Sequence, residues 1–467
     1  MLSKIDAILV VLYFGVMIIC GFIGMRSAKT KEDFLVAGRR LPTWMFLACL
    51  SAVVLGGAST IGSTKLGYQF GISGVWLVFM IGFGIILLGI LISTNLSKLH
   101  VYSINEVLEM HYGPSTRIFS AILTFIYCAM VSTVQVIGLS SILHVMMGWS
   151  NKISMIVSGG ITIFYTFFGG MWSVTLTDTI QFFLMTIGVV ILAPFFGLTK
   201  VGGFNELYHS LPANFFNLGN LGFKQIFSYF LLFVPGMMIG QDVWQRVFTA
   251  KDENVAKKGT IFSGIYCIIY GIATVLLGMC VLVVFPKLKD PQLSFATGVI
   301  KFMPVGAIGI TLAGVISALM STASGTLLAS STILFNDIYI RFINPKIDDK
   351  KTLRLNRVLI LIIGLIVLMC AIWLQDVLVA LDIAYAFLSA CIFVPVFAAF
   401  FYRKAGYKAA MSSIITSAIA VLFFFFKEGI TSTTPIIYGM ATSLITFIVV
   451  SIFNAMGETK EPKLIKE

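Results

Sequence analysis

Long apolar runs separated by short polar segments dominate the chain. Thirteen of these runs are near or above the ~20 residues that a helix needs to cross a bilayer. We therefore predict an all-α membrane protein with about 13 transmembrane helices. With boundaries good to a few residues, the runs are 5–25, 43–69, 73–96, 117–147, 151–170, 172–198, 226–248, 259–285, 304–340, 357–374, 377–402, 408–426 and 435–455.

Positively charged residues orient these helices. With the N-terminus outside, the segments that face the cytoplasm hold 23 Lys and Arg residues, the outer segments hold 8, and Lys65 lies within a run. Because cytoplasmic loops carry an excess of Lys and Arg, we predict an external N-terminus and an internal C-terminus. The charges also follow the first run instead of preceding it, which argues against a cleaved secretory signal. Only Gly169–Gly170 separate the fifth and sixth runs, so we expect a tight cytoplasmic turn there.

Composition supports the membrane interpretation and excludes several classes of function. Hydrophobic residues make up 58% of the 467 residues, charged residues make up 11%, and the mean hydropathy is +0.99. A soluble chain could not keep that much apolar surface from water. The net charge of +12 is spread thinly between apolar runs, which does not favour nucleic-acid binding. The seven cysteines and four histidines are scattered, so we expect no disulfide framework, no metal cluster and no enzyme.

Two of the runs are interrupted at matching places. Gly56–Gly57 interrupt the run 43–69, and Pro235–Gly236 interrupt the run 226–248. Broken first helices in two five-helix blocks are typical of transporters built from an inverted repeat, although glycines that pack helices closely explain the same pattern. The expected divisions are an extra N-terminal helix with a basic cytoplasmic loop (1–42), a first repeat (43–198), an external loop (199–225), a second repeat (226–402), and two C-terminal helices with a cytoplasmic tail (403–467).

Two polar features inside the runs are candidates for binding a cation. Asp178 lies about two turns into the sixth run, with no Lys or Arg within a turn of it in sequence, and a buried carboxylate needs a partner. Ala318, Ser321 and Thr322 share one helical face of the ninth run. Hard cations prefer oxygen ligands of these kinds. Hydrogen bonding of the carboxylate and close packing of the hydroxyl-bearing helix are the alternative interpretations.

Other charged residues have structural interpretations. Asp242 and Arg246 are spaced as an i,i+4 ion pair on one helix. By the same spacing, we expect Asp337 to lie near Arg341. The polar stretch 101–114 is predicted to form a short cytoplasmic surface helix.

Four stretches together resemble the sodium:solute symporter family, which includes carriers of proline, sugars, sialic acid, pantothenate and monocarboxylates. The stretches are Lys31–Arg39, Tyr165–Gln181, Gly240–Arg246 followed by Ala250–Lys251, and Ser321–Asp337. The resemblance covers nearly all of the chain. It implies an inverted five-plus-five repeat with an extra N-terminal helix, and sodium-driven symport of a small organic solute by alternating access.

The resemblance also implies where Na⁺ binds. The family's common sodium site joins the break in the first repeat helix to the eighth core helix. Its ligands would be three backbone carbonyls and two hydroxyls, at Ala52, Leu55, Ala318, Ser321 and Thr322. A second sodium site of some members would use Asp178, Ser321 and Ser324. Those members have a further hydroxyl where this chain has Gly325, so the second site has one ligand fewer here.

The solute is expected at the bilayer midplane, between the two broken helices. The candidate lining residues are Gly56, Ser59, Thr60, Lys65, Gln135, Phe233, Gly236 and Gln241. This sparse polar set favours a carboxylate or an amino acid over a sugar. Lys65 either attracts a substrate carboxylate or extends toward the outer vestibule, where Asp382 and Tyr385 are its expected partners.

The predicted function is therefore a secondary active transporter of the plasma (cell inner) membrane that uses Na⁺. A proton-coupled symporter that uses Asp178 is the alternative with the same fold. A channel or a transporter-like membrane sensor is the alternative of another class, but the sequence shows no filter motif and no appended signalling domain. The expected partners are a small-molecule solute and the lipid bilayer, and no feature indicates the oligomeric state.

Overall fold

The computed structural model describes residues 3–27, 30–168, 171–344, 349–402 and 406–457. Helices are the regular secondary structure of this part of the chain, apart from one isolated parallel bridge between Leu41 and Ala250. The predicted all-α class is confirmed for these ranges. The turn expected at Gly169–Gly170 lies outside them.

The elements fall into three groups by length and type. The long helices are α1 (Lys4–Ser27), α5 (Trp76–Leu91), α8 (Pro114–Met147), α9 (Asn151–Phe168), α10 (Met171–Met185), α13 (Phe223–Ile239), α15 (Glu253–Val284), α17 (Ala307–Thr332), α18 (Asp349–Leu374), α19 (Val377–Phe401), α20 (Tyr407–Glu428) and α21 (Thr434–Gly457). The short α-helices are α2 (Lys31–Val36), α3 (Thr43–Val54), α4 (Ser63–Phe70), α6 (Ser93–Lys98), α7 (Ile104–Tyr112), α11 (Ala193–Val201), α12 (Phe204–Ser210), α14 (Gln241–Val247) and α16 (Ser294–Phe302). The 3-10 and π segments are η1 (Ala37–Arg39), η2 (Ala58–Gly62), η3 (Gly71–Val75), η4 (Thr186–Leu192), η5 (Ala213–Phe216), η6 (Pro291–Leu293) and η7 (Ile333–Ile343).

Ten helical stretches in the described residues are long and apolar enough to cross a membrane. This agrees with a multi-pass membrane protein, although the number is smaller than the thirteen predicted runs. Part of the difference lies in the run 43–69, because its first half, α3, has only 12 residues. The second half of the run 43–69 belongs to the continuous stretch Ala58–Leu91, which also includes most of the third run, 73–96.

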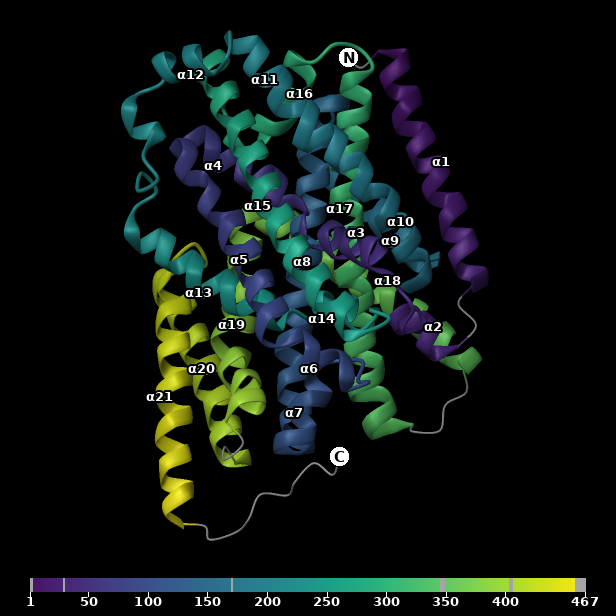
Figure 1. Ribbon diagram of the computed structural model, residues 1–467, viewed down its shortest axis with the longest axis vertical. Helices are drawn as coiled ribbons and strands as arrows, with labels where there is room; N and C mark the ends of the chain where they lie inside the picture. Colours follow the sequence, from purple (N-terminus) through teal and green to yellow (C-terminus); the bar gives the residue numbers. More distant parts are fainter. Residues whose placement is uncertain (1–2, 28–29, 169–170, 345–348, 403–405, 458–467) are drawn as a thin grey trace.

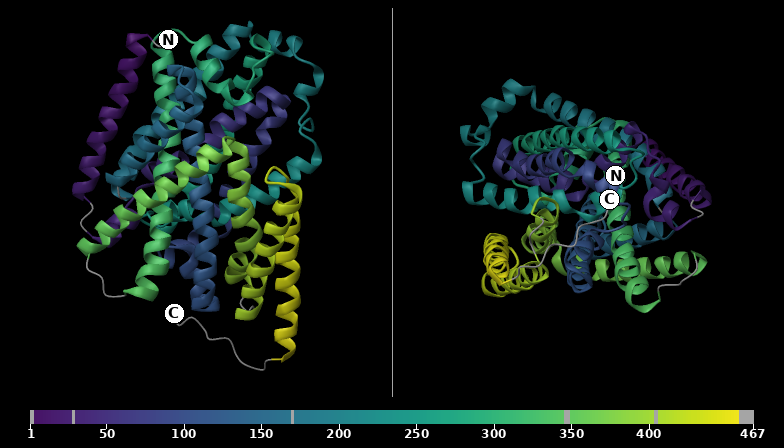
Figure 2. Two further views of the ribbon diagram at one scale, coloured as in Figure 1. Left: turned by 180° about the vertical axis from the view of Figure 1, so that it is seen from behind. Right: turned by 60° about the horizontal axis from the view of Figure 1, so that its bottom comes forward.

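The long helices form an elongated bundle with α17 near its centre (Figure 1). α1 lies at one edge, against α10 and α17, whereas α20 and α21 pair at another edge and pack on α19 (Figures 1 and 2). Within the described residues, 89% of the apolar window of the stretch Ala307–Ile343 is buried. Such burial requires close contact on every face, which explains the many small residues of α17.

The first predicted break is confirmed at Leu55–Gly57, between α3 and η2. Leu55 leaves helical geometry with φ −90° and ψ 76°. The Gly56 N–H donates to Val54 O over 3.2 Å instead of to Ala52 O, the acceptor that a continuing helix would use. The Ala52 carbonyl therefore loses its helical donor at the point where the backbone turns.

The second break is real, but its predicted position is wrong. α13 continues through Pro235 and Gly236 and ends at Gly240, where φ −60° and ψ 126° separate it from α14. The Trp244 indole donates to Met238 O over 2.8 Å and so satisfies a carbonyl near the end of α13. The helix tolerates Pro235 because a proline removes one hydrogen bond without necessarily ending a membrane helix.

The two ion pairs expected from i,i+4 spacing are also wrong. Arg246 pairs with Asp178 of α10 instead of Asp242. Asp337 of η7 pairs with Arg117 over 2.7 Å, and Arg341 pairs with Glu109 of α7. In each case a partner from another helix replaced the local one, because buried charges need close, desolvated partners. The helix expected within 101–114 is confirmed as α7, which begins after the capping residue Ser103. Its expected surface position is wrong, because Ile104, Asn105, Val107, Leu108 and Tyr112 are buried.

Candidate sodium and solute site

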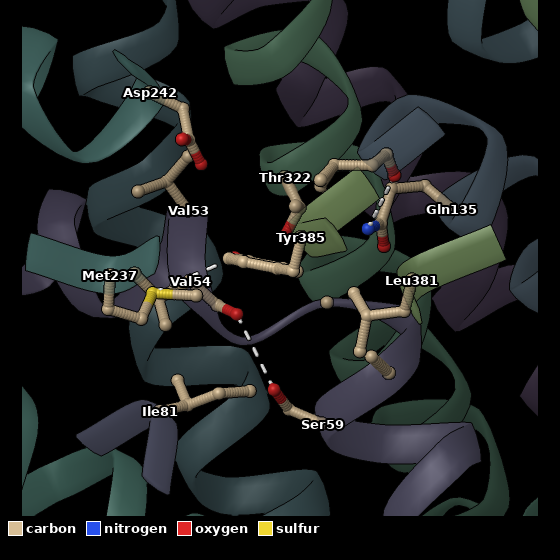
Figure 3. A pocket seen from close by; sticks show the side chains of 13 residues that line it. Val53, Val54, Ser59, Ile81, Gln135, Met237, Asp242, Thr322, Leu381 and Tyr385 are labelled. Atoms are coloured by element: carbon tan, nitrogen blue, oxygen red, sulfur yellow. Dashed lines mark hydrogen bonds between the residues drawn. The ribbon is translucent and has the colours of Figure 1, made fainter. Parts of the chain in front are cut away.

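A small cavity lies between the two helix breaks (Figure 3). The lining residues come from both breaks and from α5, α8, α17 and α19, and they are Val53, Val54, Gly56, Ala58, Ser59, Ile81, Val131, Gln135, Met237, Asp242, Thr322, Leu381 and Tyr385. The structure therefore brings together three predicted lining residues, Gly56, Ser59 and Gln135.

The predicted sodium ligands lie where the first break meets α17. The two backbones approach so closely that a Cβ added at Gly56 would lie 2.6 Å from the Thr322 hydroxyl oxygen. The Thr322 hydroxyl donates to Ala318 O over 3.2 Å, which leaves its lone pairs available as acceptors. Together with the Ala52 carbonyl, these oxygens are of the type that a hard monovalent cation prefers.

Asp178 has two buried partners. The Ser321 hydroxyl donates to its Oδ1 over 2.6 Å. Arg246 Nη2 lies 3.1 Å from its Oδ2, and the two charged side chains are 1% and 0% exposed. The sequence around Asp178 contains no cation, so this partner was missed; it comes from α14, which follows the second break.

Gly325 gives this guanidinium its space. A Cβ at Gly325 would lie 2.9 Å from Arg246 Nη2 and 2.6 Å from Val53 Cγ2. The Ser324 hydroxyl donates to Ser321 O over 3.0 Å. The residues proposed for a second sodium site are thus bonded among themselves, and a tethered cation already lies beside the carboxylate.

Gln135 holds the first break from α8. Its Oε1 accepts from the Gly57 N–H over 2.6 Å, and its Nε2 donates to Val131 O over 3.0 Å. A side chain at Gly56 would overlap the Gln135 amide. Ser59 donates to Val54 O over 3.5 Å at the cavity wall, as Figure 3 shows.

Three other predicted lining residues pack behind the cavity wall. Phe233 and Gly236 contact the ring of Tyr385, with the Phe233 and Tyr385 centroids 5.1 Å apart. Thr60 shares a 2.6 Å hydrogen bond with the hydroxyl of Tyr270. These residues support the cavity wall from behind, but they do not line the cavity themselves.

Gln241 lies away from the cavity, at the start of α14 directly after the second break. Its Nε2 donates to Tyr102 O and its Oε1 accepts from the Ile104 N–H, each over 2.9 Å. Both contacts fix the start of α14 to the segment that begins α7. The Gln241 side chain therefore has a structural role, although the sequence predicted that it would contact the substrate.

Lys65 also has a partner that the sequence did not suggest. Its Nζ lies 2.6 Å from Asp376 Oδ2, so the pair joins α4 to the start of α19. Asp376 Oδ1 accepts from the N–H groups of Leu378 and Val379 as well. Burial opposes ionisation of Asp376, but Lys65 and these N–H groups outweigh it and hold its pKa below the usual value. Neither Asp382 nor Tyr385 forms the expected ion pair or hydrogen bond with Lys65.

The cavity is also lined by a carboxylate, Asp242, that was not among the predicted lining residues. Asp242 occupies the first turn of α14 and accepts a 2.9 Å hydrogen bond from the hydroxyl of Tyr127. Its i,i+4 spacing to Arg246 had instead predicted a local ion pair on one helix. Gly240, which ends α13 two residues before Asp242, is the signal that could have placed Asp242 at the second break.

A comparison of the sequence with known protein families agrees with this arrangement of two broken helices around a cavity. Residues 34–417 match the sodium:solute symporter family. The chain belongs to this family. The resemblance seen in the sequence is thereby confirmed, and a sodium-coupled transporter fold is expected of such a member.

Individual family members are similar to this chain over almost their whole length. The sodium/glucose cotransporter of Vibrio parahaemolyticus is 23% identical, with 98% of this chain and 91% of the relative covered. The osmoregulated proline transporter of Bacillus subtilis is also 23% identical, with coverage of 95% and 94%. The outward-open structure of a Na⁺-coupled sialic acid symporter has a TM-score of 0.82 at 19% identity, with coverage of 98% and 99%. At this identity the structural match shows the fold alone.

Proposed function

We propose that Na⁺ binds between the first break and α17 and drives uptake of a small organic solute that occupies the adjoining cavity. The proposed ligands are Ala52, Leu55, Ala318, Ser321 and Thr322. The observation that carries this proposal is the position of Thr322, which lines the cavity and also lies against Gly56 in the break. An ion bound there would link the solute site to both helices.

The proposed mechanism is alternating access. Na⁺ bridges α3 and α17 and favours the outward-open state, solute then binds, and inward opening releases both. Each monovalent charge that crosses gains about 2.3 kcal/mol per 100 mV of membrane potential. The Asp178–Arg246 pair supports sodium coupling over proton coupling, because a proton carried on Asp178 would leave a buried guanidinium without its countercharge.

We also propose the thirteen-span topology with an external N-terminus, an internal C-terminus and a location in the plasma (cell inner) membrane. The ten apolar stretches become thirteen spans when α1 and α9 are included and α3–α4 is separated from α5. The inverted five-plus-five repeat is supported by the two breaks. They lie at Leu55–Gly57 and Gly240, in the first helices of the blocks 43–198 and 226–402.

The experiment is a thermal-shift screen of the purified protein, followed by uptake into proteoliposomes. Solutes are tested in NaCl and in KCl, because a ligand that binds the folded state raises its apparent stability. We expect the stabilising solute to act in NaCl and to accumulate only with an inward sodium gradient. Uptake that persists without Na⁺ and follows an imposed pH gradient would instead establish the proton-coupled alternative.

A further inference from the structure

The cavity contains a carboxylate without a basic partner. Asp242 lines the cavity and is 3% exposed. In the part of the chain that the structure describes, it forms no ion pair, since the basic residue on its own helix, Arg246, is paired with Asp178. Arg246 also attracts Asp242, and the N–H groups of Asp242 and Val243 at the start of α14 support its carboxylate. Because the guanidinium is within ion-pair distance of Asp178 alone, the three side chains together leave one negative charge, on the cavity side.

Two tyrosines lie on one side of this carboxylate. Tyr127 donates its hydroxyl to Asp242 Oδ1 over 2.9 Å, and the hydroxyls of Tyr127 and Tyr385 are 3.2 Å apart. The rings of these two tyrosines meet edge to face with centroids 5.1 Å apart, and Phe233 packs on Tyr385 at the same distance. The sulfur of Met237 lies 3.8 Å from the Tyr385 hydroxyl.

A carboxylate beside aromatic rings suits a positively charged nitrogen. Burying an unpaired carboxylate is unfavourable, so a ligand that brings the missing charge is favoured. Aromatic rings attract ammonium groups through their negative faces, and this attraction strengthens where water is excluded. Neutral sugars and simple carboxylates offer no positive charge, and a carboxylate would be repelled.

Sodium is the competing cation, and only one of its proposed ligands, Thr322, lines the cavity with Asp242. The other proposed ligands lie at the first break and on α17, whereas Asp242 lies on α14 and accepts its hydrogen bond from Tyr127 of α8. The cavity wall is mainly apolar, whereas a hard cation prefers several oxygen ligands.

We propose that Asp242 binds a positively charged nitrogen of the transported solute, and that the solute is a small amine or ammonium compound. Tyr127 positions the carboxylate, and Tyr385 supplies an aromatic wall. This assignment rests on the proposed function, since it gives a substrate class to the same cavity. It leaves the opposite end of the solute unassigned and so includes both zwitterions and simple cations.

The test uses the purified full-length protein in saturating NaCl and a panel of named solutes. The charged-nitrogen set contains the protein amino acids, glycine betaine, choline and putrescine, and the comparison set contains glucose, pyruvate, acetate and pantothenate. We expect stabilisation only within the first set. For the solute found, Asp242→Asn should weaken binding about 30-fold or more, because one partner of a buried charge pair is lost. Tyr127→Phe should have a smaller effect in the same direction.

Asp337→Asn is the matched control, since it neutralises another buried aspartate that does not line the cavity. Its solute affinity should equal that of the wild type, and the sodium-induced thermal shift shows that Asp242→Asn is folded. Stabilisation by the comparison set alone, by no charged-nitrogen solute, or equally in Asp242→Asn would overturn the assignment. A variant that needs more Na⁺ but binds solute normally at saturating Na⁺ would assign Asp242 to the ion and also overturn it. Sodium-independent binding in the wild type would contradict the proposed function instead.

Discussion

Arg246 and Asp178 form a buried ion pair between α14 and α10, with Nη2 and Oδ2 3.1 Å apart. Ser321, a proposed sodium ligand, donates to the other carboxylate oxygen. The pair therefore adjoins the proposed sodium site without belonging to the cavity. Because the guanidinium neutralises Asp178 in this conformation, we propose that no second mobile cation binds there.

The ion pair should make single substitutions much more damaging than the double substitution. Arg246→Gln or Asp178→Asn leaves one buried charge unpaired, and such a loss destabilises a protein by about 3–5 kcal/mol. The double variant Asp178→Asn/Arg246→Gln leaves no unpaired charge and should recover much of that loss. Apparent unfolding free energies of the four proteins in detergent give the coupling energy. Purely additive losses would show that the two charges do not depend on each other.

Transport should couple one Na⁺ to each solute molecule. The second site would have to accept a cation beside Arg246, and like charges repel strongly where water is excluded. Parallel measurement of sodium and solute fluxes in proteoliposomes, or of the reversal potential, gives the ratio. A ratio of two would mean that the guanidinium moves away from Asp178 during the cycle.

Gly56 should not tolerate any side chain. A Cβ there would lie 2.6 Å from the Thr322 hydroxyl and would overlap Gln135. We expect Gly56→Ala to abolish sodium-dependent uptake, because the break and α17 could no longer approach. Gly160→Ala in α9 is the matched control, since a Cβ there meets nothing within 4 Å. Normal uptake by Gly56→Ala would remove the support for an ion site at this contact.

Thr322→Ala should raise the Na⁺ concentration for half-maximal uptake, by about 10-fold if the hydroxyl contributes ~1.4 kcal/mol as a ligand. Ser330→Ala is the control on the same helix, where the hydroxyl donates to Thr326 O. Thr322 gives a clearer result than Ser321, because removing the Ser321 hydroxyl also deprives Asp178 of a hydrogen bond. An unchanged sodium requirement in Thr322→Ala would contradict the proposed site.

The helices were predictable because apolar length is a local property of the chain. The first break was also predictable, since Gly56–Gly57 both permit the turn and are needed for the close contact with Thr322. The second was misplaced because Pro235 and Gly236 are usual helix breakers, yet α13 continues through them. A membrane helix can lose one hydrogen bond at proline and remain intact.

Charge partners were not predictable from spacing. Asp242 and Arg246 satisfy the i,i+4 rule, but each finds a partner on another helix, Tyr127 in one case and Asp178 in the other. Surface i,i+4 pairs contribute only ~0.5 kcal/mol, far less than the penalty for an unpaired buried charge. Burial between helices therefore decides which charged groups pair. For the same reason, the position of Asp242 at the cavity could not be predicted from its spacing to Arg246.

The Lys65–Asp376 pair should stabilise the folded protein at neutral pH and lose its effect in acid. The pKa of Asp376 lies below its usual value when folded, whereas the unfolded value is about 3.9. The contribution is therefore present above about pH 4 and declines as the pH falls through the lower, folded-state pKa. Melting temperatures of wild type and Lys65→Gln, compared from pH 3 to pH 8, should differ by a constant amount above about pH 5 and converge toward pH 3.

Lys65→Gln is preferable to a change at Asp376, because Asp376 also caps α19 through the N–H groups of Leu378 and Val379. Lys200→Gln, at an exposed site, should match the wild type at every pH and so excludes a general effect of lysine removal. A gap between wild type and Lys65→Gln that does not narrow as the pH falls below about 4 would rule out the pair as its cause. Uptake measurements separate the two interpretations of Lys65. Because its ammonium group already binds Asp376, Lys65→Gln should leave solute selectivity unchanged. A selective loss of uptake of carboxylate-bearing solutes would instead show that the substrate displaces Asp376.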